Sequence, residues 1–451
     1  MQVSRPRLVF TLAVLTAINT LNFFDRQILP AVQEKIRHEW SLSDSQLGWL
    51  GTAFILLYAI VGVPLGRWAD VGPRKWILAG GVALWSLLTF GSGIAWNFWS
   101  LFVMRLGVGV GEASCAPVAT SMIGDLVGPR KRARALGLFM LGLPLGLALS
   151  YVVSGTVAER YSWQIAFFIA GGPGLVLALL ALLLADVRSE HPSTGNQLSP
   201  SMNSTPSKTG TSFRQAVGII LGLPTMWWII FSGAIHNFNM YALGSFLASL
   251  LKRYHHLTVE EAGWVTGLIF GFGALGLFAS GWLGDWAFHR WISGRLQVAW
   301  ICTALAIPCL FLALAARPGE VTQCAVWLIA GYMLCYCYYG TVYAAIQDII
   351  EPSLRGTAMA IYFFAMYFLG AMLGPVGVGW LSDWSARRVA ARFGQSVPSE
   401  VHVAQGLHEA MYAVPLLAGL LVVVLFAATQ TFATDYERRH QRERLAQPTV
   451  D

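Results

Sequence analysis

Charged residues are scarce in this sequence. Of its 451 residues, 30 are Lys or Arg and 23 are Asp or Glu, so that 12% are charged while 56% are hydrophobic. A soluble domain has about a quarter of its residues charged. The composition therefore excludes an ordinary soluble globular protein.

Three further features are missing. The net charge is +7, but the basic residues are scattered over short segments and form no stripe that would bind nucleic acid. Five of the six cysteines fall in apolar runs, which argues against a disulfide framework. The polar segments contain no nucleophile–base pair and no metal-ligand spacing, so we expect neither an enzyme nor a metal site.

What the sequence has instead is a series of apolar runs, each long enough to cross about 30 Å of hydrocarbon. The first run contains Asp25 and Arg26 and lacks a small-residue cleavage site, so we interpret it as a retained span rather than a signal peptide. We predict an all-α membrane protein with twelve transmembrane helices, at residues 8–32, 45–68, 76–96, 98–124, 134–157, 163–185, 225–250, 262–284, 296–316, 321–349, 356–382 and 408–432.

The basic residues predict the orientation of these spans. If the N-terminus is cytoplasmic, the inner segments hold nineteen Lys and Arg and the outer loops hold nine. Cytoplasmic loops carry the excess of basic residues, so both termini are expected in the cytoplasm. We expect a bacterial inner (plasma) membrane as the location, with membrane lipids as partners and a monomeric chain. The basic tail at 435–451 is expected to lie against anionic lipid.

One break in composition divides the chain. Residues 186–212 are rich in Ser, Thr, Pro, Gly and Asn and cannot bury enough apolar surface to fold alone. We therefore predict a six-helix bundle at 1–185, a flexible cytoplasmic linker at 186–212 and a second six-helix bundle at 213–434. The polar segment 385–407 is long for a loop, and we expect a short interfacial helix within it.

Internal repeats support the division into two pseudo-symmetric halves. A glycine is followed four residues later by an acid at Gly66–Asp70, Gly155–Glu159, Gly281–Asp285 and Gly379–Asp383, each time near the end of the second span of a three-span unit. The segment Asp125 to Ala135 also matches Asp348 to Ala358 at an offset of 223 residues. Nested three-span repeats of this kind are typical of secondary transporters.

The segment from Gly66 to Lys75 resembles the signature loop of the major facilitator superfamily, although Val71 and Pro73 depart from its usual pattern. Arg105-x-x-x-Gly109 resembles the fourth-span signature of proton-coupled members. Asn22-Phe-Phe-Asp25-Arg26 and the run from Gly109 to Ser114 resemble the Spinster branch, which includes transporters of sphingosine phosphate and lysophospholipids. The resemblance implies the major facilitator fold and a cytoplasmic gate, which we assign to Gly66, Asp70, Arg74, Lys75, Asp125, Arg132, Asp348 and Arg355.

Four charges fall inside predicted spans. Arg105 and Glu112 are seven residues apart, close to two helical turns, and so share one helix face. Gly107, Gly109 and Gly111 between them would let a neighbouring helix approach closely. Asp25 and Arg26 lie at a depth similar to that of Arg105. Charges at bilayer depth usually face a cavity and do work there.

We expect these four residues to couple transport to protons. Arginine does not readily release its proton, so the carriers would be Asp25 and Glu112, with Arg26 and Arg105 as counter-charges. Rocking of the helices would change whether Glu112 faces Arg105, and with it the affinity of Glu112 for a proton. Protons are then the coupling ion, and no cofactor is needed.

The second half has no matching charges and offers aromatic and amphipathic side chains instead. Tyrosines at 332, 336, 339 and 343 fall on one helix face. His236 alone is interpreted as a hydrogen-bonded helix contact rather than a proton carrier, and the stripe itself is also compatible with ordinary helix packing. We predict a substrate cavity lined by Asn22, His236, Asn237, Asn239, Tyr241, Tyr332, Tyr336, Tyr339 and Tyr343.

A charged half opposite an aromatic half suits a molecule with a polar head and an apolar tail. We therefore predict a proton-coupled secondary transporter that moves a lysophospholipid or sphingoid lipid by alternating access. The alternative is a proton symporter for a small organic anion, such as a sugar acid or aromatic acid, whose carboxylate would bind Arg26 and Arg105. A non-transporting receptor is disfavoured because buried titratable groups would be costly and unused.

Overall fold

The computed structural model describes residues 4–127, 129–184, 213–351 and 354–446, and every regular element in them is a helix. The first half holds α1 (Arg5–Trp40), α2 (Asp44–Val71), α3 (Arg74–Ser92), α4 (Phe98–Glu112), α5 (Cys115–Leu126), α6 (Pro129–Met140), α7 (Gly142–Arg160) and α8 (Trp163–Leu182). The second half holds α9 (Phe213–Leu221), α10 (Pro224–Tyr254), α11 (Val259–Phe288), α12 (Gly294–Leu314), α13 (Val321–Ile349), α14 (Arg355–Ala365), the π-helix η2 (Met366–Ala371), α15 (Leu373–Arg392), α16 (Glu400–Met411) and α17 (Ala413–Ala446).

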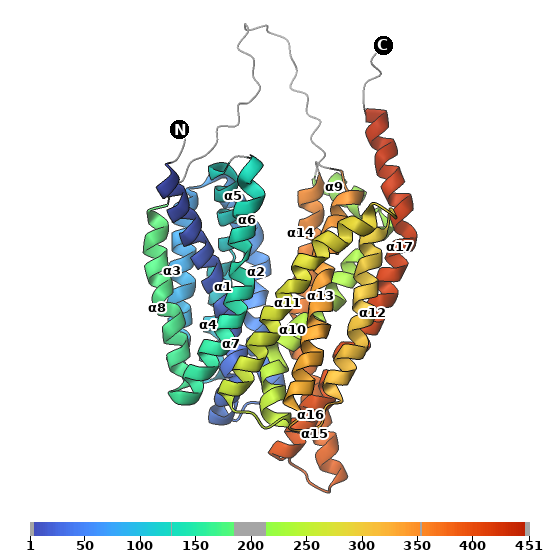
Figure 1. The fold of residues 1–451 in the computed structure, drawn as a ribbon. Helices are drawn as coiled ribbons and strands as arrows, with labels where there is room; N and C mark the ends of the chain where they lie inside the picture. Colours follow the sequence, from blue (N-terminus) through green and yellow to red (C-terminus); the bar gives the residue numbers. More distant parts are fainter. Residues whose placement is uncertain (1–3, 128, 185–212, 352–353, 447–451) are drawn as a thin grey trace, which may run out of the picture.

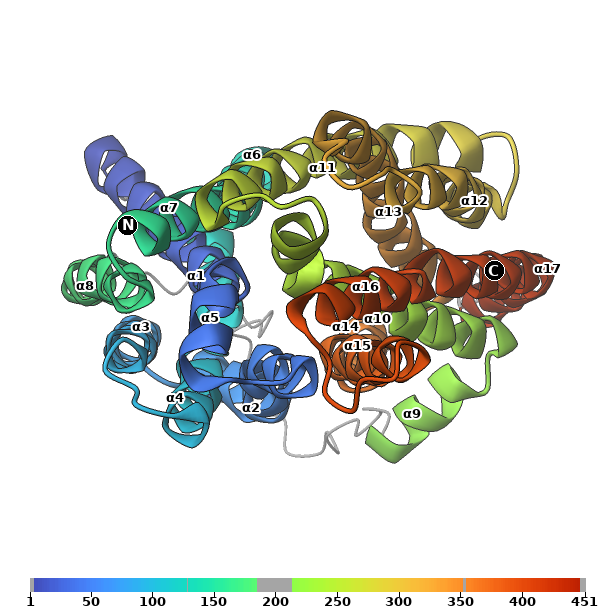
Figure 2. The ribbon, with the colours of Figure 1, turned by 90° about the horizontal axis from the view of Figure 1, so that it is seen from below.

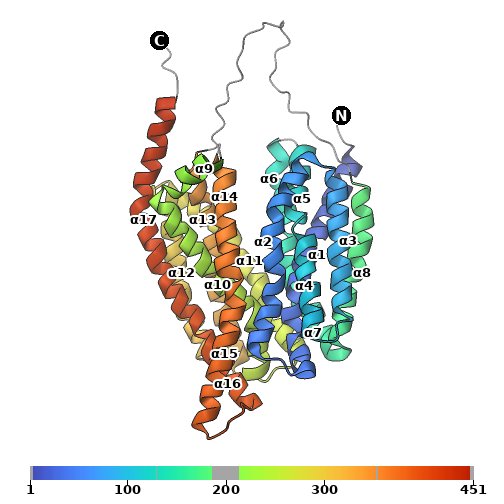
Figure 3. The ribbon, with the colours of Figure 1, turned by 180° about the vertical axis from the view of Figure 1, so that it is seen from behind.

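The two halves stand side by side with their long helices roughly parallel (Figure 1). Helices α1–α8 form one group and α9–α17 the other, and the view from behind shows the same division (Figure 3). Seen along the helices, α7 faces α11 and α2 faces α15 across the boundary (Figure 2). The start of α1 and the end of α17 lie at one end of the molecule, which we call the terminal face; the other end is the opposite face (Figure 1).

Ten helices in the described part of the chain are long and apolar enough to cross a membrane, and α9 with α10 makes an eleventh if that pair, bent by 87°, counts as one span. Helix α3 is not among them, although it packs between α4 and α8. The structure is thus an all-helical membrane protein, while the number twelve remains a prediction. The predicted linker at 186–212 lies outside the described residues.

The helices near the centre of the molecule are interrupted. The predicted span 98–124 is two helices, α4 and α5, separated at Ala113 and Ser114, and the Ser114 hydroxyl donates to the carbonyl of Gly111 at 2.8 Å. A single residue, Leu141, separates α6 from α7. The predicted span 356–382 contains η2, and π-helical turns are frequent at functional sites.

The polar segment at 385–407 differs in its boundaries from the expectation. Helix α15 continues to Arg392, ten residues past the predicted end of its span at 382, and α16 begins at Glu400 with a capping box at Ser399. The short helix therefore occurs, but it extends to Met411 and packs against α15.

Glycine allows α4 to approach α2 closely, as its sequence predicts. A Cβ built on Gly109 would lie 2.1 Å from the carbonyl oxygen of Phe54, closer than any real side chain could sit. This contact fixes the face of α4 that carries Arg105 and Glu112 against its neighbours, so that both side chains are buried.

Candidate functional site

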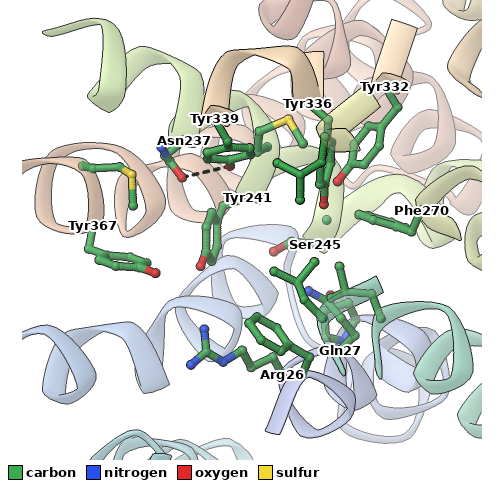
Figure 4. Close-up of a pocket in the computed structure, with 18 of the residues that line it drawn as sticks. Arg26, Gln27, Asn237, Tyr241, Ser245, Phe270, Tyr332, Tyr336, Tyr339 and Tyr367 are labelled. Carbon is green, nitrogen blue, oxygen red and sulfur yellow. Dashed lines mark hydrogen bonds between the residues drawn. The ribbon is translucent and has the colours of Figure 1, made fainter. Parts of the chain in front are cut away.

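A cavity of about 430 Å³ lies between the two halves. The first half supplies residues of α1, α2, α6 and α7, and the second supplies residues of α10, α11, α13 and η2. Its polar groups include Arg26 and Gln27 on one side and Asn237, Ser245 and several tyrosine hydroxyls on the other (Figure 4). A cavity lined mainly by apolar and aromatic groups with few polar ones is typical of a small-molecule site.

The aromatic wall comes from α13. Tyr332, Tyr336, Tyr339 and Tyr343 all line the cavity, as their helical spacing predicts. Successive rings contact each other, with centroid distances of 5.0, 5.6 and 5.8 Å along the series. The Tyr339 hydroxyl donates to Oδ1 of Asn237 at 3.3 Å, which ties the wall to α10.

The cavity wall in the first half carries an ion pair. Arg26 Nε donates to Oε2 of Glu112 at 2.8 Å, and both side chains are almost fully buried. The Arg26 guanidinium also lies over three aromatic rings, with its Cζ 4.9 Å from the centroid of Phe23, 5.5 Å from Phe54 and 4.6 Å from Tyr58. The Glu112 partner is therefore Arg26, whereas the sequence had suggested Arg105.

Asp25 and Arg105 come together behind this pair. Arg105 Nη2 donates to the backbone carbonyl of Asp25 at 3.1 Å, and the Thr89 hydroxyl donates to Oδ2 of Asp25 at 3.1 Å. Arg105 forms no ion pair within the described residues, although its side chain is only 1% exposed. The four charges are close together, but only one salt bridge joins them.

Several atoms of this cluster lack a partner. They are Oδ1 of Asp25, Oε1 of Glu112, and Nε and Nη1 of Arg105, all buried. Buried polar groups are nearly always hydrogen-bonded, so a cluster with four open positions is unusual. Each open carboxylate oxygen is a position where a proton or a bound water could satisfy the group.

Three residues predicted for the cavity lie outside its wall: Asn22, His236 and Asn239. On α10 the lining residues Asn237, Met240, Tyr241, Gly244 and Ser245 lie on one side of the helix, and at about 100° per residue His236 and Asn239 fall outside that side. His236 instead stacks on Tyr338 with ring centroids 4.0 Å apart, and its Nε2 has no hydrogen-bond partner. It is a stacked helix contact rather than the hydrogen-bonded one expected.

Other lining residues were not predicted. Gln27 and Ser245 contribute polar atoms, and Tyr367 projects from η2. Tyr151 contacts two lining residues: its hydroxyl donates to the Gly244 carbonyl, and its ring stacks on Phe270 with the centroids 5.2 Å apart. The position of Gln27 directly after Asp25 and Arg26 could have predicted that it lines the cavity. The π-helix that sets the direction of Tyr367 left no visible signal in the sequence.

Several predicted gate residues form contacts within each half at the terminal face. Arg74 pairs with Asp125 at 2.6 Å in the first half. In the second, Arg295 bridges Asp348 and Asp285, and Arg355 donates to the Gln347 carbonyl at 3.1 Å. The structure describes no specific contact of Lys75. Gly66 and the side chains of Asp70 and Arg132 lie outside the described part.

A buried ion-pair network joins the halves near the opposite face. Arg253 of α10 binds Oε1 of Glu34 in α1 at 2.6 Å and Oδ1 of Asp44 in α2 at 2.8 Å. The Ser382 hydroxyl of α15 also donates to Asp44 at 2.6 Å. The sequence prediction placed Arg253 in an outer loop and gave it no role.

Two of the glycine–acid repeats form matching contacts beside this network. Oδ1 and Oδ2 of Asp383 accept the backbone N–H groups of Asp44 and Ser45, each at 2.9 Å, at the start of α2. Oε2 of Glu159 accepts the N–H of Val259 at 3.2 Å, at the start of α11. In each case an acid of one half caps a helix of the other half. We call these two contacts the capping latches.

The glycines of the same repeats make the capping latches possible. A Cβ on Gly379 would lie 2.3 Å from the carbonyl oxygen of Asp44, and one on Gly155 would lie 3.0 Å from that of Val259. The four-residue spacing from glycine to acid thus places a backbone contact and a cap on one helix face.

Among the described residues, no group of three His, Cys, Asp or Glu side chains could hold a metal ion.

A helical membrane protein with two repeated halves, a central cavity and buried charges has the architecture of a secondary transporter. The sequence profile of the Major Facilitator Superfamily matches residues 15–375, so the chain belongs to that family. Family and fold are those of transporters rather than enzymes.

Within that family the chain is Spinster-like. It is 27% identical to human protein spinster homolog 1, across 84% of this chain and 74% of the relative. The crystal structure of a bacterial homologue of the human lysosomal transporter Spinster, in an inward-facing and unoccupied conformation, superposes with a TM-score of 0.84 at 27% identity, covering 96% of this chain and 99% of that one.

Other relatives are named for different roles. An MFS-type efflux pump of Mycolicibacterium smegmatis is 30% identical over 82% of this chain and 83% of its own length. A hexuronate transporter of Bacillus subtilis is 26% identical over 80% of this chain and 85% of its own length. Family membership thus leaves the substrate class open.

Proposed function

We propose that this protein is a proton-coupled transporter of an amphipathic lipid of the lysophospholipid or sphingoid type. The observation that carries the proposal is the cavity, which has a buried arginine–glutamate pair on one side and a continuous tyrosine wall on the other. A polar head at Arg26 and an apolar tail along α13 would satisfy both sides at once.

The balance of the lining supports a lipid over a sugar acid. A sugar presents hydroxyls all round and needs many hydrogen-bond partners, because unpaired buried polar groups are costly. Most lining side chains are apolar or aromatic, among them Phe23, Phe54, Leu143, Leu147 and Phe270. These groups offer a sugar ring few partners but would pack well against an acyl chain.

Proton coupling is supported by the buried charges. Glu112 holds Arg26 through one oxygen while its second oxygen is unpartnered, and Asp25 likewise has an open oxygen. Carboxylates buried in this way are poised to exchange protons when the surrounding helices move. We propose Asp25 and Glu112 as the carriers and Arg26 and Arg105 as their counter-charges, with protons as the coupling ion and no cofactor.

The remaining features complete the proposed transporter. Twelve spans result if α3 and the bent pair α9–α10 also cross the membrane, with both termini in the cytoplasm of a bacterial cell and the chain acting as a monomer. The contacts of Arg253 and the capping latches would then close the outer side. Alternating access would require them to break while gate residues such as Asp70, Arg74 and Lys75 close the inner side.

Uptake into proteoliposomes tests the proposal. A labelled lysophospholipid and labelled galacturonate are offered with and without an imposed pH gradient. We expect gradient-driven movement of the lipid and none of the sugar acid. Gradient-driven galacturonate uptake without lipid movement would overturn the lipid assignment and support the alternative, a proton symporter for organic anions, which the likeness to the hexuronate transporter favours.

A further inference from the structure

The Arg26 guanidinium has hydrogen-bond donors that its protein partner does not use. Nε is engaged by Glu112, whereas no hydrogen bond within the described residues involves Nη1 or Nη2. The residue lines the cavity, so these two nitrogens are within reach of its contents. A guanidinium with two free nitrogens can bind an oxyanion through paired hydrogen bonds.

Three tyrosines lie close to the same place, Tyr241 and Tyr367 in the cavity wall and Tyr58 beside it. Tyr58 of α2 lies under the guanidinium, and its ring centroid is 5.7 Å from that of Tyr367. Tyr241 of α10 lies 6.4 Å from Tyr367 by the same measure. In Figure 4 the hydroxyl ends of Tyr241 and Tyr367 point toward each other, on the side of the cavity where the Arg26 guanidinium lies.

The four side chains come from both halves of the protein. Arg26 and Tyr58 belong to the first half, and Tyr241 and Tyr367 belong to the second. Tyr367 is part of η2, so its direction depends on a π-helical turn that shifts the following residues relative to an α-helix. A ligand held by all four would bridge the two halves directly.

We propose that Arg26, Tyr58, Tyr241 and Tyr367 form a binding site for an oxyanion, a phosphate or carboxylate, on the transported molecule. The inference rests on the proposed transport function and adds a chemical requirement to it. An oxyanion only accepts hydrogen bonds, while the guanidinium and the phenol O–H groups can donate them. The site therefore selects an anionic head over a neutral or cationic one.

The arrangement also assigns different parts of the ligand to different tyrosines. Tyr241 and Tyr367 act through their hydroxyls at the anion, whereas Tyr332 and Tyr336, which lie across the cavity above Gln27 in Figure 4, contribute mainly ring surface to the tail. Removing a hydroxyl while keeping the ring separates these roles. Tyrosine to phenylalanine is that change.

Calorimetric titration of the full chain in a neutral maltoside detergent tests the site with three soluble probes. Octyl phosphate carries an anion and a tail, glucuronate carries an anion without a tail, and octyl glucoside carries the same tail without charge. For Tyr241→Phe and Tyr367→Phe we expect octyl phosphate to bind about tenfold more weakly, the usual effect of losing a hydrogen bond to a charged group. Octyl glucoside affinity should stay within about twofold.

Matched variants keep the test decisive. Tyr338→Phe serves as control, because this buried α13 tyrosine contacts Ser232 at 2.7 Å and does not line the cavity; octyl phosphate should bind it as it binds wild type. Tyr58→Phe provides an independent variant in the first half and should weaken octyl phosphate as well. Unchanged octyl phosphate affinity in the Tyr58, Tyr241 and Tyr367 variants would overturn the site.

The probes also distinguish the site from the transport proposal. If glucuronate binds and weakens in these variants while octyl phosphate does not bind, the oxyanion site stands and its ligand is a sugar acid. If the variants lose octyl glucoside as strongly as octyl phosphate, the hydroxyls are structural and the site is wrong. Failure of proton-driven flux alongside tyrosine-dependent binding would overturn only the transport mechanism.

Discussion

At the scale of single residues, the cluster of Asp25, Arg26, Arg105 and Glu112 is held together incompletely. One salt bridge, one hydroxyl and one backbone carbonyl satisfy part of it, and several buried atoms are left open. If the cluster served only to hold helices together, each of its polar atoms would be expected to have a hydrogen-bond partner, because an unpaired buried polar group weakens the fold. The open positions are what a carrier of exchangeable protons requires.

Glu112→Gln tests this interpretation. The amide cannot exchange a proton with the carboxylate's affinity, but its oxygen can still accept from Arg26. We expect transport that no longer responds to an imposed pH gradient, with the thermal unfolding midpoint within a few degrees of wild type. Glu320→Gln is the control, because this carboxylate caps the Arg317 N–H on the surface at 2.9 Å. Retained gradient dependence in Glu112→Gln would exclude Glu112 as a carrier.

At the scale of helices, the capping latches give a role to two of the four glycine–acid repeats. The negative side chain of Asp383 or Glu159 sits at the first N–H groups of a helix from the other half, where a cap contributes about 0.5–2 kcal/mol. The two contacts are related by the internal repeat, since each joins the second span of a three-span unit to a helix start across the boundary.

Asp383→Asn and Glu159→Gln should each loosen the opposite face. We expect each variant to shift the population toward the state open at that face, and the double variant to shift it further. Distances between spin labels placed on α2 and α15 report the change directly. Asp285→Asn is the matched control, because this repeat acid pairs with Arg295 inside one half. Equal shifts in all three variants would contradict a specific latch.

The sequence predicted which segments form helices and which segments repeat, but it predicted less well which side chains pair with one another. Spans of about twenty apolar residues and the spacing of the α13 tyrosines follow from hydrocarbon thickness and helical periodicity, which are local rules. The pairing of Arg26 with Glu112, and of Arg253 with Glu34 and Asp44, depends on how helices far apart in the chain are rotated against one another. The position of Tyr367 depends on a π-turn, which leaves no periodic signal in the sequence.

At the scale of the whole molecule, the two halves are held together by a buried charge. Arg253 donates to both Glu34 and Asp44, and all three are largely inaccessible to solvent. Breaking one partner of such a network leaves uncompensated buried charges and typically costs about 3–5 kcal/mol. The network therefore has a larger effect on the closed state than any exposed pair.

Arg253→Ala should strongly destabilise the closed opposite face, because it leaves buried Asp44 without a cation and Glu34 with only the longer contact to Arg37 at 3.6 Å. The expected result is a lower unfolding midpoint and a population shifted to the open state, again measured between spin labels. Arg160→Ala is the comparison: its pair with Glu260 at 2.7 Å also joins the halves, but the arginine side chain is 63% exposed. Exposed pairs contribute about 0–1 kcal/mol. Similar effects of the two variants would show that burial of the Arg253 network has no special role.

The most direct test of proton-coupled lipid transport is the movement of the protons themselves. Proteoliposomes are loaded with a pH-sensitive dye, lysophospholipid is added outside without an imposed gradient, and internal pH is followed for wild type and Glu112→Gln. We expect a pH change that accompanies lipid movement in wild type and disappears in the variant. Lipid movement with no pH change in wild type, or an equal change in both proteins, would contradict it.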